Sequence, residues 1–329
     1  MLRILRAGCV RACLSAVASL QVILFVSISA TCVGKEPAKP VLPTWHPLVE
    51  FQYESDGIKI PVPTVDEARV EQFDGASVTL SVNYLQQGAL AWVRERGCVN
   101  CHTTGPYMTE VPGLKKWLGE PLEEVHANFV IDIPKEIKTI KEVERKGHRY
   151  YPRSYYAVWR SAGLAEWDKH VTGELSGATK CSLEDMFERQ SANGSFVTYG
   201  EVEVPHITTD FELTLQAARA VATAPGWLES IDDKELIERV QRMKDFLRDA
   251  KPKNDFDRVL RLQLSHYMPE LVSAEQRQEA IELLWTNQHS DGGWSTRDMS
   301  RLDDWHYTIS SKVRTLVEGL PDAEKPESD

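Results

Sequence analysis

The sequence has little cysteine, more acid than base, and no apolar run long enough for a comfortable membrane span. Its 329 residues contain six cysteines, too few for a disulfide-built scaffold of this size, so the fold needs a hydrophobic core. Lys and Arg total 38 against 49 Asp and Glu, giving a net charge of −11. This balance argues against nucleic acid as a partner. Chain length permits one large core or two small ones.

The first thirty residues have the pattern of a secretory signal. They contain three arginines and no acid, and an apolar stretch from Leu14 to Ile28 leads into small residues. We expect cleavage near Ala30 and a periplasmic or cell-surface location. Membrane anchoring through an uncleaved signal or a lipid on Cys32 remains an open alternative. Removing residues 1–30 lowers Lys plus Arg from 38 to 35 against the same 49 acids, a net charge near −14.

Proline and hydrophobic periodicity divide the rest of the chain. Residues 31–78 are rich in proline, which removes backbone donors, and they predict an extended segment. Residues 79–317 predict one helical domain, and residues 318–329 a disordered tail or a truncated next repeat. Apolar residues at helical spacing mark five stretches: Val82 to about Gly97, Tyr155–Trp167, Phe211–Thr223, Leu236–Leu247 and Phe256–Tyr267.

Capping signals support an all-α fold. Ser182 with Asp185, and Ser273 with Gln276, place a capping side chain three residues before an acid or amide, and Asp232 with Glu235 is a looser case. The one strand signal is the period-two pattern at residues 199–204.

A seven-residue motif occurs twice. Residues 190–196 (Gln-Ser-Ala-Asn-Gly-Ser-Phe) and 288–294 (Gln-His-Ser-Asp-Gly-Gly-Trp) each follow an amphipathic helix. Their glutamines lie 98 positions apart, or two units of about 49 residues, and residues 251–254 fall where a degenerate middle copy is expected. A glutamine amide can bond a neighbouring helix end, glycine permits a tight turn, and the ring fills the gap between helical hairpins.

At these residues the chain resembles the prenyltransferase and squalene-oxidase repeat family, the squalene-cyclase-like α/α toroids. The resemblance implies helical hairpins around a central cavity, here as a partial toroid. The family's cyclases protonate their substrate with an Asp-x-Asp-Asp segment, which this chain lacks; Asp232-Asp233 and Asp303-Asp304 are simple pairs. The Asp, Cys and His zinc site of the protein prenyltransferases cannot be assembled outside the Cys98 region. We therefore assign no catalytic residue.

Residues 98–102 (Cys-Val-Asn-Cys-His) fit the Cys-x-x-Cys-His pattern of c-type haem attachment. Cys98 and Cys101 can form thioethers to the two vinyl groups on one porphyrin edge, and His102 then becomes the proximal iron ligand. Export agrees with this chemistry. The prediction is one covalent haem c, with Cys98, Cys101 and His102 as cofactor ligands and His102 as the metal ligand.

Two other interpretations of the motif stay open: a Cys98–Cys101 disulfide or dithiol, and a zinc site that recruits Cys181 or a distant histidine. Met108 lies too close to His102 in sequence to pass the porphyrin edge and ligate the iron. A sixth ligand would come from His126, His148, His170 or Met186, or the position is open.

The preferred function is electron transfer or redox-linked binding with an unknown redox partner protein. The alternative is an exported non-haem binding or scaffold module whose cavity holds an isoprenoid-like lipid or a protein segment. A terpenoid cyclase ranks third, because the acidic segment that its chemistry requires is missing.

Overall fold

The computed structural model describes residues 51–61, 75–100, 102–133, 154–197, 209–289, 292–294 and 296–299. The predicted signal at residues 1–30 and the predicted strand at residues 199–204 lie outside this part of the chain. Apart from one two-stranded sheet, the secondary structure described is helical. This confirms the all-α class.

A short β-hairpin lies within the segment expected to be merely extended. Strand β1 (Phe51–Ser55) pairs antiparallel with β2 (Ile58–Pro61). The turn between them uses Asp56 and Gly57, both at positive φ, and Asp-Gly is the dipeptide that such tight hairpin turns favour. Ile58 and Ile60 are buried against the first helix. Sequence analysis missed this hairpin because two alternating isoleucines are too short a pattern beside many prolines.

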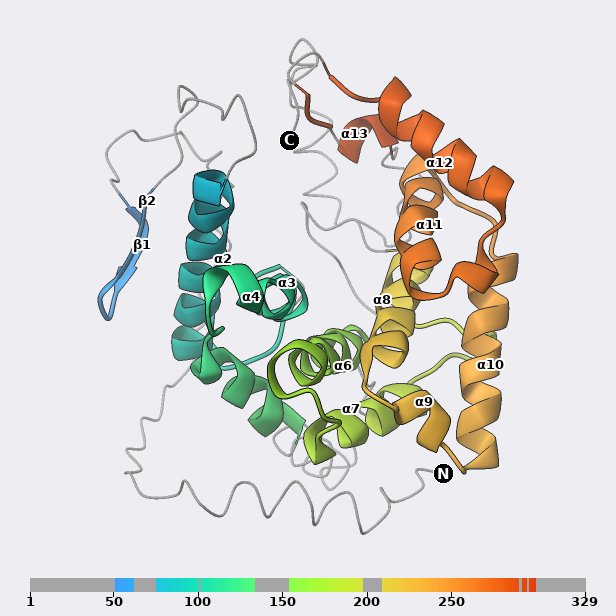
Figure 1. Ribbon diagram of the computed structural model, residues 1–329, viewed down its shortest axis with the longest axis horizontal. Helices are drawn as coiled ribbons and strands as arrows, with labels where there is room; N and C mark the ends of the chain where they lie inside the picture. The colour runs from blue at the N-terminus through green and yellow to red at the C-terminus, as the bar shows by residue number, and fades with distance from the viewer. Residues whose placement is uncertain are drawn as a thin grey trace, which may run out of the picture.

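The longer helices form two curved rows (Figure 1). The inner row consists of α3 (Thr104–Glu110), α6 (Ser154–Trp167), α8 (Asp210–Thr223) and α11 (Asp255–Tyr267). The outer row consists of α2 (Gly75–Glu95), the helix at residues 123–133, α7 (Gly177–Glu188), α10 (Lys234–Asp249) and α12 (Ala274–Thr286). The shorter elements are η1 (Pro112–Leu114), α4 (Lys115–Leu118), η2 (Asp168–Thr172), α9 (Trp227–Ser230), η3 (Pro269–Leu271) and α13 (Thr296–Met299).

Neighbouring inner helices run in the same direction. Thr209 Oγ1 donates to Asp257 Oδ1 at 2.7 Å, which joins the start of α8 to the start of α11. Arg219 Nε donates to Glu166 Oε1 at 2.7 Å, which joins the ends of α8 and α6. Each inner helix also contacts an outer one: α6 packs on α7, α8 on α10 and α11 on α12. The described chain is therefore a succession of inner–outer helix pairs.

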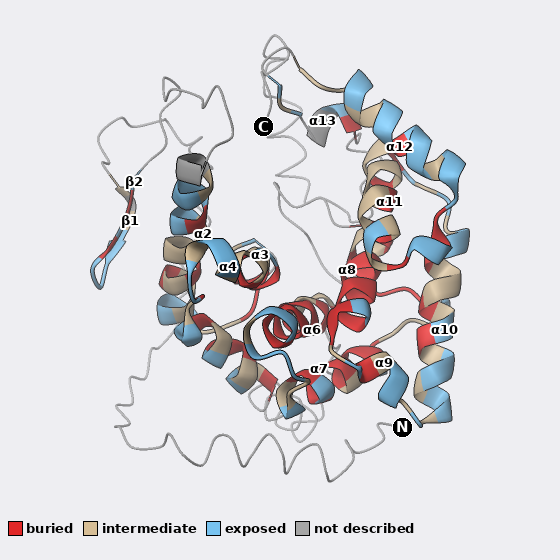
Figure 2. Ribbon diagram, in the orientation of Figure 1, coloured by how far each residue is buried: buried red, intermediate tan, exposed pale blue. Residues whose placement is uncertain are grey.

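The most buried helices lie in the middle of the arc (Figure 2). Nearly every residue of α6 and α8 is buried, because both faces of these helices meet other helices. The main core cluster joins α6, α7, α8, α10 and α11, and a second cluster joins α2, α3 and residues 125–133 to Leu164, Trp167 and Cys181. The five predicted helical stretches overlap α2, α6, α8, α10 and α11, although α2 begins at Gly75, inside the segment predicted to be extended.

The capping predictions have three different outcomes. Ser273 forms a full capping box with Gln276 at the start of α12, as predicted. At α10 the cap is Asp233, whose side chain accepts from Glu235 N and Leu236 N, rather than its neighbour Asp232. The Ser182 prediction is wrong: α7 begins at Gly177 with Ser176 as its cap, and Ser182 lies inside the helix.

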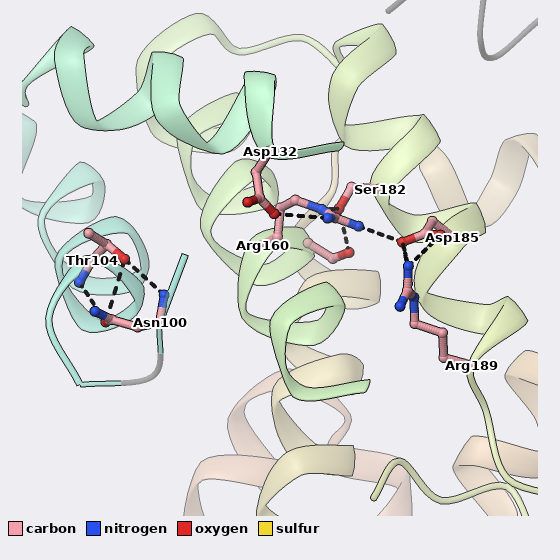
Figure 3. A network of polar contacts seen from close by, with 8 residues as sticks. Asn100, Thr104, Asp132, Arg160, Ser182, Asp185 and Arg189 are labelled. Atoms are coloured by element: carbon pink, nitrogen blue, oxygen red, sulfur yellow. Dashed lines mark hydrogen bonds and ion pairs between the residues drawn. The ribbon is translucent and has the colours of Figure 1, made fainter. Parts of the chain in front are cut away.

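Ser182 belongs instead to a buried ionic network (Figure 3). Arg160 is fully buried and donates to Ser182 Oγ at 3.1 Å, to Asp132 Oδ2 at 3.1 Å and to Asp185 Oδ2 at 2.5 Å. Asp185 also accepts from Arg189. Burial opposes ionisation of Asp185, but the two guanidinium groups outweigh it and hold its pKa below the usual value. The network fastens the helix at residues 123–133, α6 and α7 together.

Candidate functional site: the Cys98–His102 loop

The loop that carries the cysteine motif begins where α2 ends. The backbone N–H groups of Arg96 and Gly97 both donate to Trp92 O, at 2.8 Å and 3.2 Å. Gly97 has a φ of +61°, a left-handed conformation that glycine adopts without steric cost and that commonly closes a helix. The chain therefore turns sharply just before Cys98, as sequence analysis expected from the position of Gly97.

The two residues between the cysteines anchor the loop to the protein. Val99 is fully buried in the core cluster of α2 and α3. The side chain of Asn100 accepts from the backbone N–H groups of His102, Thr103 and Thr104 at 3.2, 2.7 and 3.0 Å, and so holds together the turn that leads into α3. Sequence analysis missed this role, although an asparagine just before a new helix is the available signal.

Cys98 and His102 meet on the indole of Trp92. Trp92 Nε1 donates to Cys98 Sγ at 3.3 Å, and the rings of Trp92 and His102 contact edge to face with centroids 4.9 Å apart. His102 is exposed and Cys98 half-buried. Trp92 lies six residues before Cys98 near the end of α2, and no sequence motif marked it.

A free Cys98 contradicts the disulfide interpretation of the motif but not the dithiol one. Cys98 is a free thiol, so the structure contains no Cys98–Cys101 disulfide. Cys181 is disulfide-bonded, and its partner lies outside the described residues. A thiol held in a disulfide is not a zinc ligand, and no group of three or more His, Cys, Asp or Glu side chains within the described ranges could hold a metal ion.

The described part of the motif fits a c-type haem. The donor set is a free thiol and an exposed imidazole, and the residues that anchor the loop, Val99 and Asn100, are buried and distinct from the two ligand side chains. Haem attachment at the predicted ligands would therefore leave the core contacts of the loop intact. Cys101, the second predicted attachment residue, is outside the described residues.

Candidate sixth ligands lie in other surroundings. Met108 is fully buried in the α2–α3 core cluster. His126 stacks on Trp167 with ring centroids 4.2 Å apart, and His170 Nε2 lies 3.3 Å from Glu166 Oε2. Met186 is buried in the main core cluster. His148 is outside the described residues.

A second polar cluster joins the ends of the inner helices. Arg219 donates to Glu166 Oε1 and Glu110 Oε1, each at 2.7 Å, and to Thr109 O at 2.5 Å. Its guanidinium also lies 5.4 Å from the ring centre of Tyr267. Burial alone would lower the pKa of Arg219, but Glu166 and Glu110 raise it. Every guanidinium nitrogen is thus occupied, and the cluster fastens α3, α6 and α8 at one end.

A cavity of about 370 Å³ lies beside this cluster, at the end of α8. Lys169, Thr223 and Glu229 supply its polar lining, and the turn at residues 224–226 supplies much of the remainder. Such a lining gives no specific support for an isoprenoid ligand, which needs an extended apolar wall. Within the described ranges, no helix has the length and apolar character to cross a membrane.

Comparison of the chain with known protein families, with curated proteins and with solved structures finds no match.

Proposed function

We propose that this chain is an exported c-type haem protein with one covalent haem, attached through Cys98 and Cys101 and ligated by His102, on a partial α/α toroid of squalene-cyclase type. It serves electron transfer or redox-linked binding with a redox partner protein. The observation that carries the proposal is the meeting of the free Cys98 thiol and the exposed His102 imidazole on Trp92. A bound haem supplies one-electron redox chemistry.

The protein's own residues have positioning roles in this proposal. Asn100 fixes the backbone of His102 and Thr103 through its side-chain oxygen, so the imidazole stays at the start of α3. Trp92 presents its indole N–H to the Cys98 sulfur and covers one edge of the His102 ring. Val99, buried beneath the loop, keeps water from its inner side.

The repeat architecture is supported by two loops with the same hydrogen bonds. Gln190 Nε2 donates to Gly194 O at 3.0 Å, and Gln288 Nε2 donates to Gly292 O at 2.8 Å. In both loops the residue after the glutamine donates its N–H to the carbonyl four residues later: Ser191 to Ser195, and His289 to Gly293. Both loops follow an outer helix, α7 or α12, which is where a toroid repeat places this motif.

The test is expression of the full chain with a c-type haem maturation system, followed by a denaturing gel stained for haem peroxidase activity. We expect a stained wild-type band that is lost in a double Cys98→Ala, Cys101→Ala variant. Cys181→Ala is the matched control, because it removes a cysteine that lies outside the motif, and it should retain the stain.

Intact mass under non-reducing conditions separates haem from a competing disulfide. A thioether at Cys101 and a disulfide from Cys101 to Cys181 exclude each other, since each consumes the same sulfur. A colourless wild-type band with the mass of the apoprotein would overturn the haem proposal, and a non-reducing peptide map then shows whether Cys101 pairs with Cys181. The same measurement on the exported protein should show residues 1–30 removed.

A further inference from the structure

We call the loops that begin at Gln190 and Gln288 the first and second glutamine loops. Positions that are buried at the first loop are exposed at the second. Phe187 and Phe196 are 1% and 0% exposed, whereas Trp285 and Trp294, which occupy the same places relative to Gln288, are 70% and 37% exposed. Leu183 is likewise 0% exposed, and its counterpart Ile281 is 39% exposed. We call Ile281, Trp285 and Trp294 the terminal patch.

The terminal patch is one continuous surface at the end of the helical arc. Ile281 and Trp285 are four residues apart on α12, so they share a face. Trp294 Nε1 donates to Leu284 O at 2.7 Å, which holds the third side chain against the last turns of the same helix. Clustered large apolar side chains at a surface indicate that another element covers them.

At the first loop, the chain that follows the motif supplies the cover. Phe196 N donates to Thr214 Oγ1 of α8 at 2.9 Å. Trp227, at the start of α9, stacks on Phe187 with ring centroids 6.0 Å apart. The cover thus consists of the next inner helix and the turn after it, both downstream of the loop.

The sequence after the second loop repeats the residues that make these contacts. Asp304-Trp305-x-x-Thr308 has the pattern of Asp210-Phe211-x-x-Thr214 at the start of α8. Apolar residues then continue at helical spacing: Trp305, Ile309, Val313, Leu316 and Leu320. Thr308 follows Trp294 by 14 positions and Thr214 follows Phe196 by 18, so the connection is of similar length.

The last described element also lies next to the position that such a covering helix would occupy. Its last element, α13, contacts α11, and Met299 is buried. The chain therefore returns from the outer helix α12 to the last helix of the inner row, where the next inner helix is required. Thirty residues follow Met299, enough for a counterpart of α8.

We propose that residues 304–320 of this chain dock on the terminal patch as the next inner helix. In this arrangement Thr308 Oγ1 accepts a hydrogen bond from the backbone N–H of Trp294. The proposal rests on the repeat architecture proposed above and does not depend on the haem. Failure of the docking proposal can be distinguished from failure of the haem proposal, because the haem stain does not respond to changes at Thr308.

Amide hydrogen exchange of the full chain tests this contact directly. Thr308→Val removes the acceptor and should accelerate exchange of the Trp294 amide about tenfold, the usual worth of one hydrogen bond. Thr308→Ser keeps the hydroxyl and should retain protection. Thr214→Val is the matched control and should accelerate the Phe196 amide in the same way, while Thr315→Val in the proposed segment should leave Trp294 unchanged.

Two results would overturn the proposal. The first is that the backbone amide of Trp294 exchanges at the unprotected rate in the wild type. The same conclusion follows if Thr308→Val leaves the exchange rate of Trp294 unchanged while Thr214→Val accelerates exchange at Phe196. The second is that protection of the Trp294 amide rises with protein concentration while sedimentation shows a doubled mass. That result would mean that a second copy of the chain covers the terminal patch. Unchanged protection of the α6 amides shows that each variant is folded.

Discussion

The two glutamine loops have the same internal hydrogen bonds but different neighbours. Gln190 Nε2 bonds Gly194 O within its loop and also reaches Arg239 O of α10 at 2.9 Å. Gln288 Nε2 bonds only Gly292 O among the described residues. Local sequence thus closes each loop, whereas the helix packed behind it decides how much stability the loop contributes. Four predictions follow from this contrast, beginning with the largest effect.

The two loop glycines, Gly194 and Gly292, should differ most in how much their substitution destabilises the protein. A Cβ at Gly194 would lie 2.1 Å from Arg242 O, and the residue has a φ of +91°. Gly292 has a similar φ of +88° but nothing within 4 Å. Gly194→Ala should therefore lower the free energy of unfolding by about 3–5 kcal/mol, from strain plus overpacking, and Gly292→Ala by about 1–2 kcal/mol from strain alone. Equal losses in urea unfolding would contradict the difference in packing.

The aromatic residues provide the second comparison. Phe196 is fully buried, so Phe196→Ala should cost about 3–5 kcal/mol. If residues 304–320 cover the ring as proposed, Trp294→Ala should cost a similar amount in the full chain but only about 1–2 kcal/mol in a chain that ends at Met299. Thermal and urea unfolding of these variants and of their two parent chains measures the loss of unfolding free energy. A cost at Trp294 that does not depend on the segment would place the cover elsewhere.

Substitution of the glutamines should have a smaller effect. Gln190→Ala removes two hydrogen bonds, one of them to α10, and should cost about 1–2 kcal/mol. Gln288→Ala removes one exposed bond and should cost about 0.5–1 kcal/mol. Double-mutant cycles with an exposed residue such as Gln278 check additivity. Identical costs would show that the contact with Arg239 is not stabilising.

The last prediction concerns pH and α8, the helix that covers the first loop. Burial, with Asp257 close by, raises the pKa of Glu212 to about 8, and its Oε2 atom is buried without a hydrogen-bond partner. The folded protein therefore holds a proton here that the unfolded chain releases above its ordinary pKa near 4.5. The stabilisation present below pH 4.5 should be lost as pH rises toward 8.

Glu212→Gln tests this dependence, because the amide keeps the shape of the side chain and cannot ionise. The variant should show a flatter dependence of unfolding free energy on pH between about 4.5 and 8 than the wild type does. Glu238→Gln is a suitable control, since it makes the same chemical change at an exposed side chain. Parallel profiles for wild type and Glu212→Gln would show that Glu212 is ionised in the folded state.

Strong periodicity made most of the helices predictable, and weak patterns accounted for the errors. The helices α6, α8, α10 and α11 lie where apolar spacing placed them, because each has a continuous buried face. The Ser182 cap was wrong because the same residue pair also occurs inside a helix, where Ser182 bonds Arg160. At the candidate site, the sequence predicted Cys98 and His102 but neither Trp92 nor Asn100, whose contacts depend on how the chain turns between α2 and α3.

The sequence by itself determined the mostly helical character, the position of most of the long helices and the residue types present at positions 98–102, because these depend on local spacing and residue type. Only the tertiary structure decided which cysteine is free, which charges are buried and which aromatic residues are covered. Arg160, Asp185 and Arg219 look like ordinary surface charges in the sequence, and they become buried only because helices far apart along the chain enclose them. Burial and disulfide pairing are properties of distant contacts, and a local pattern does not encode them.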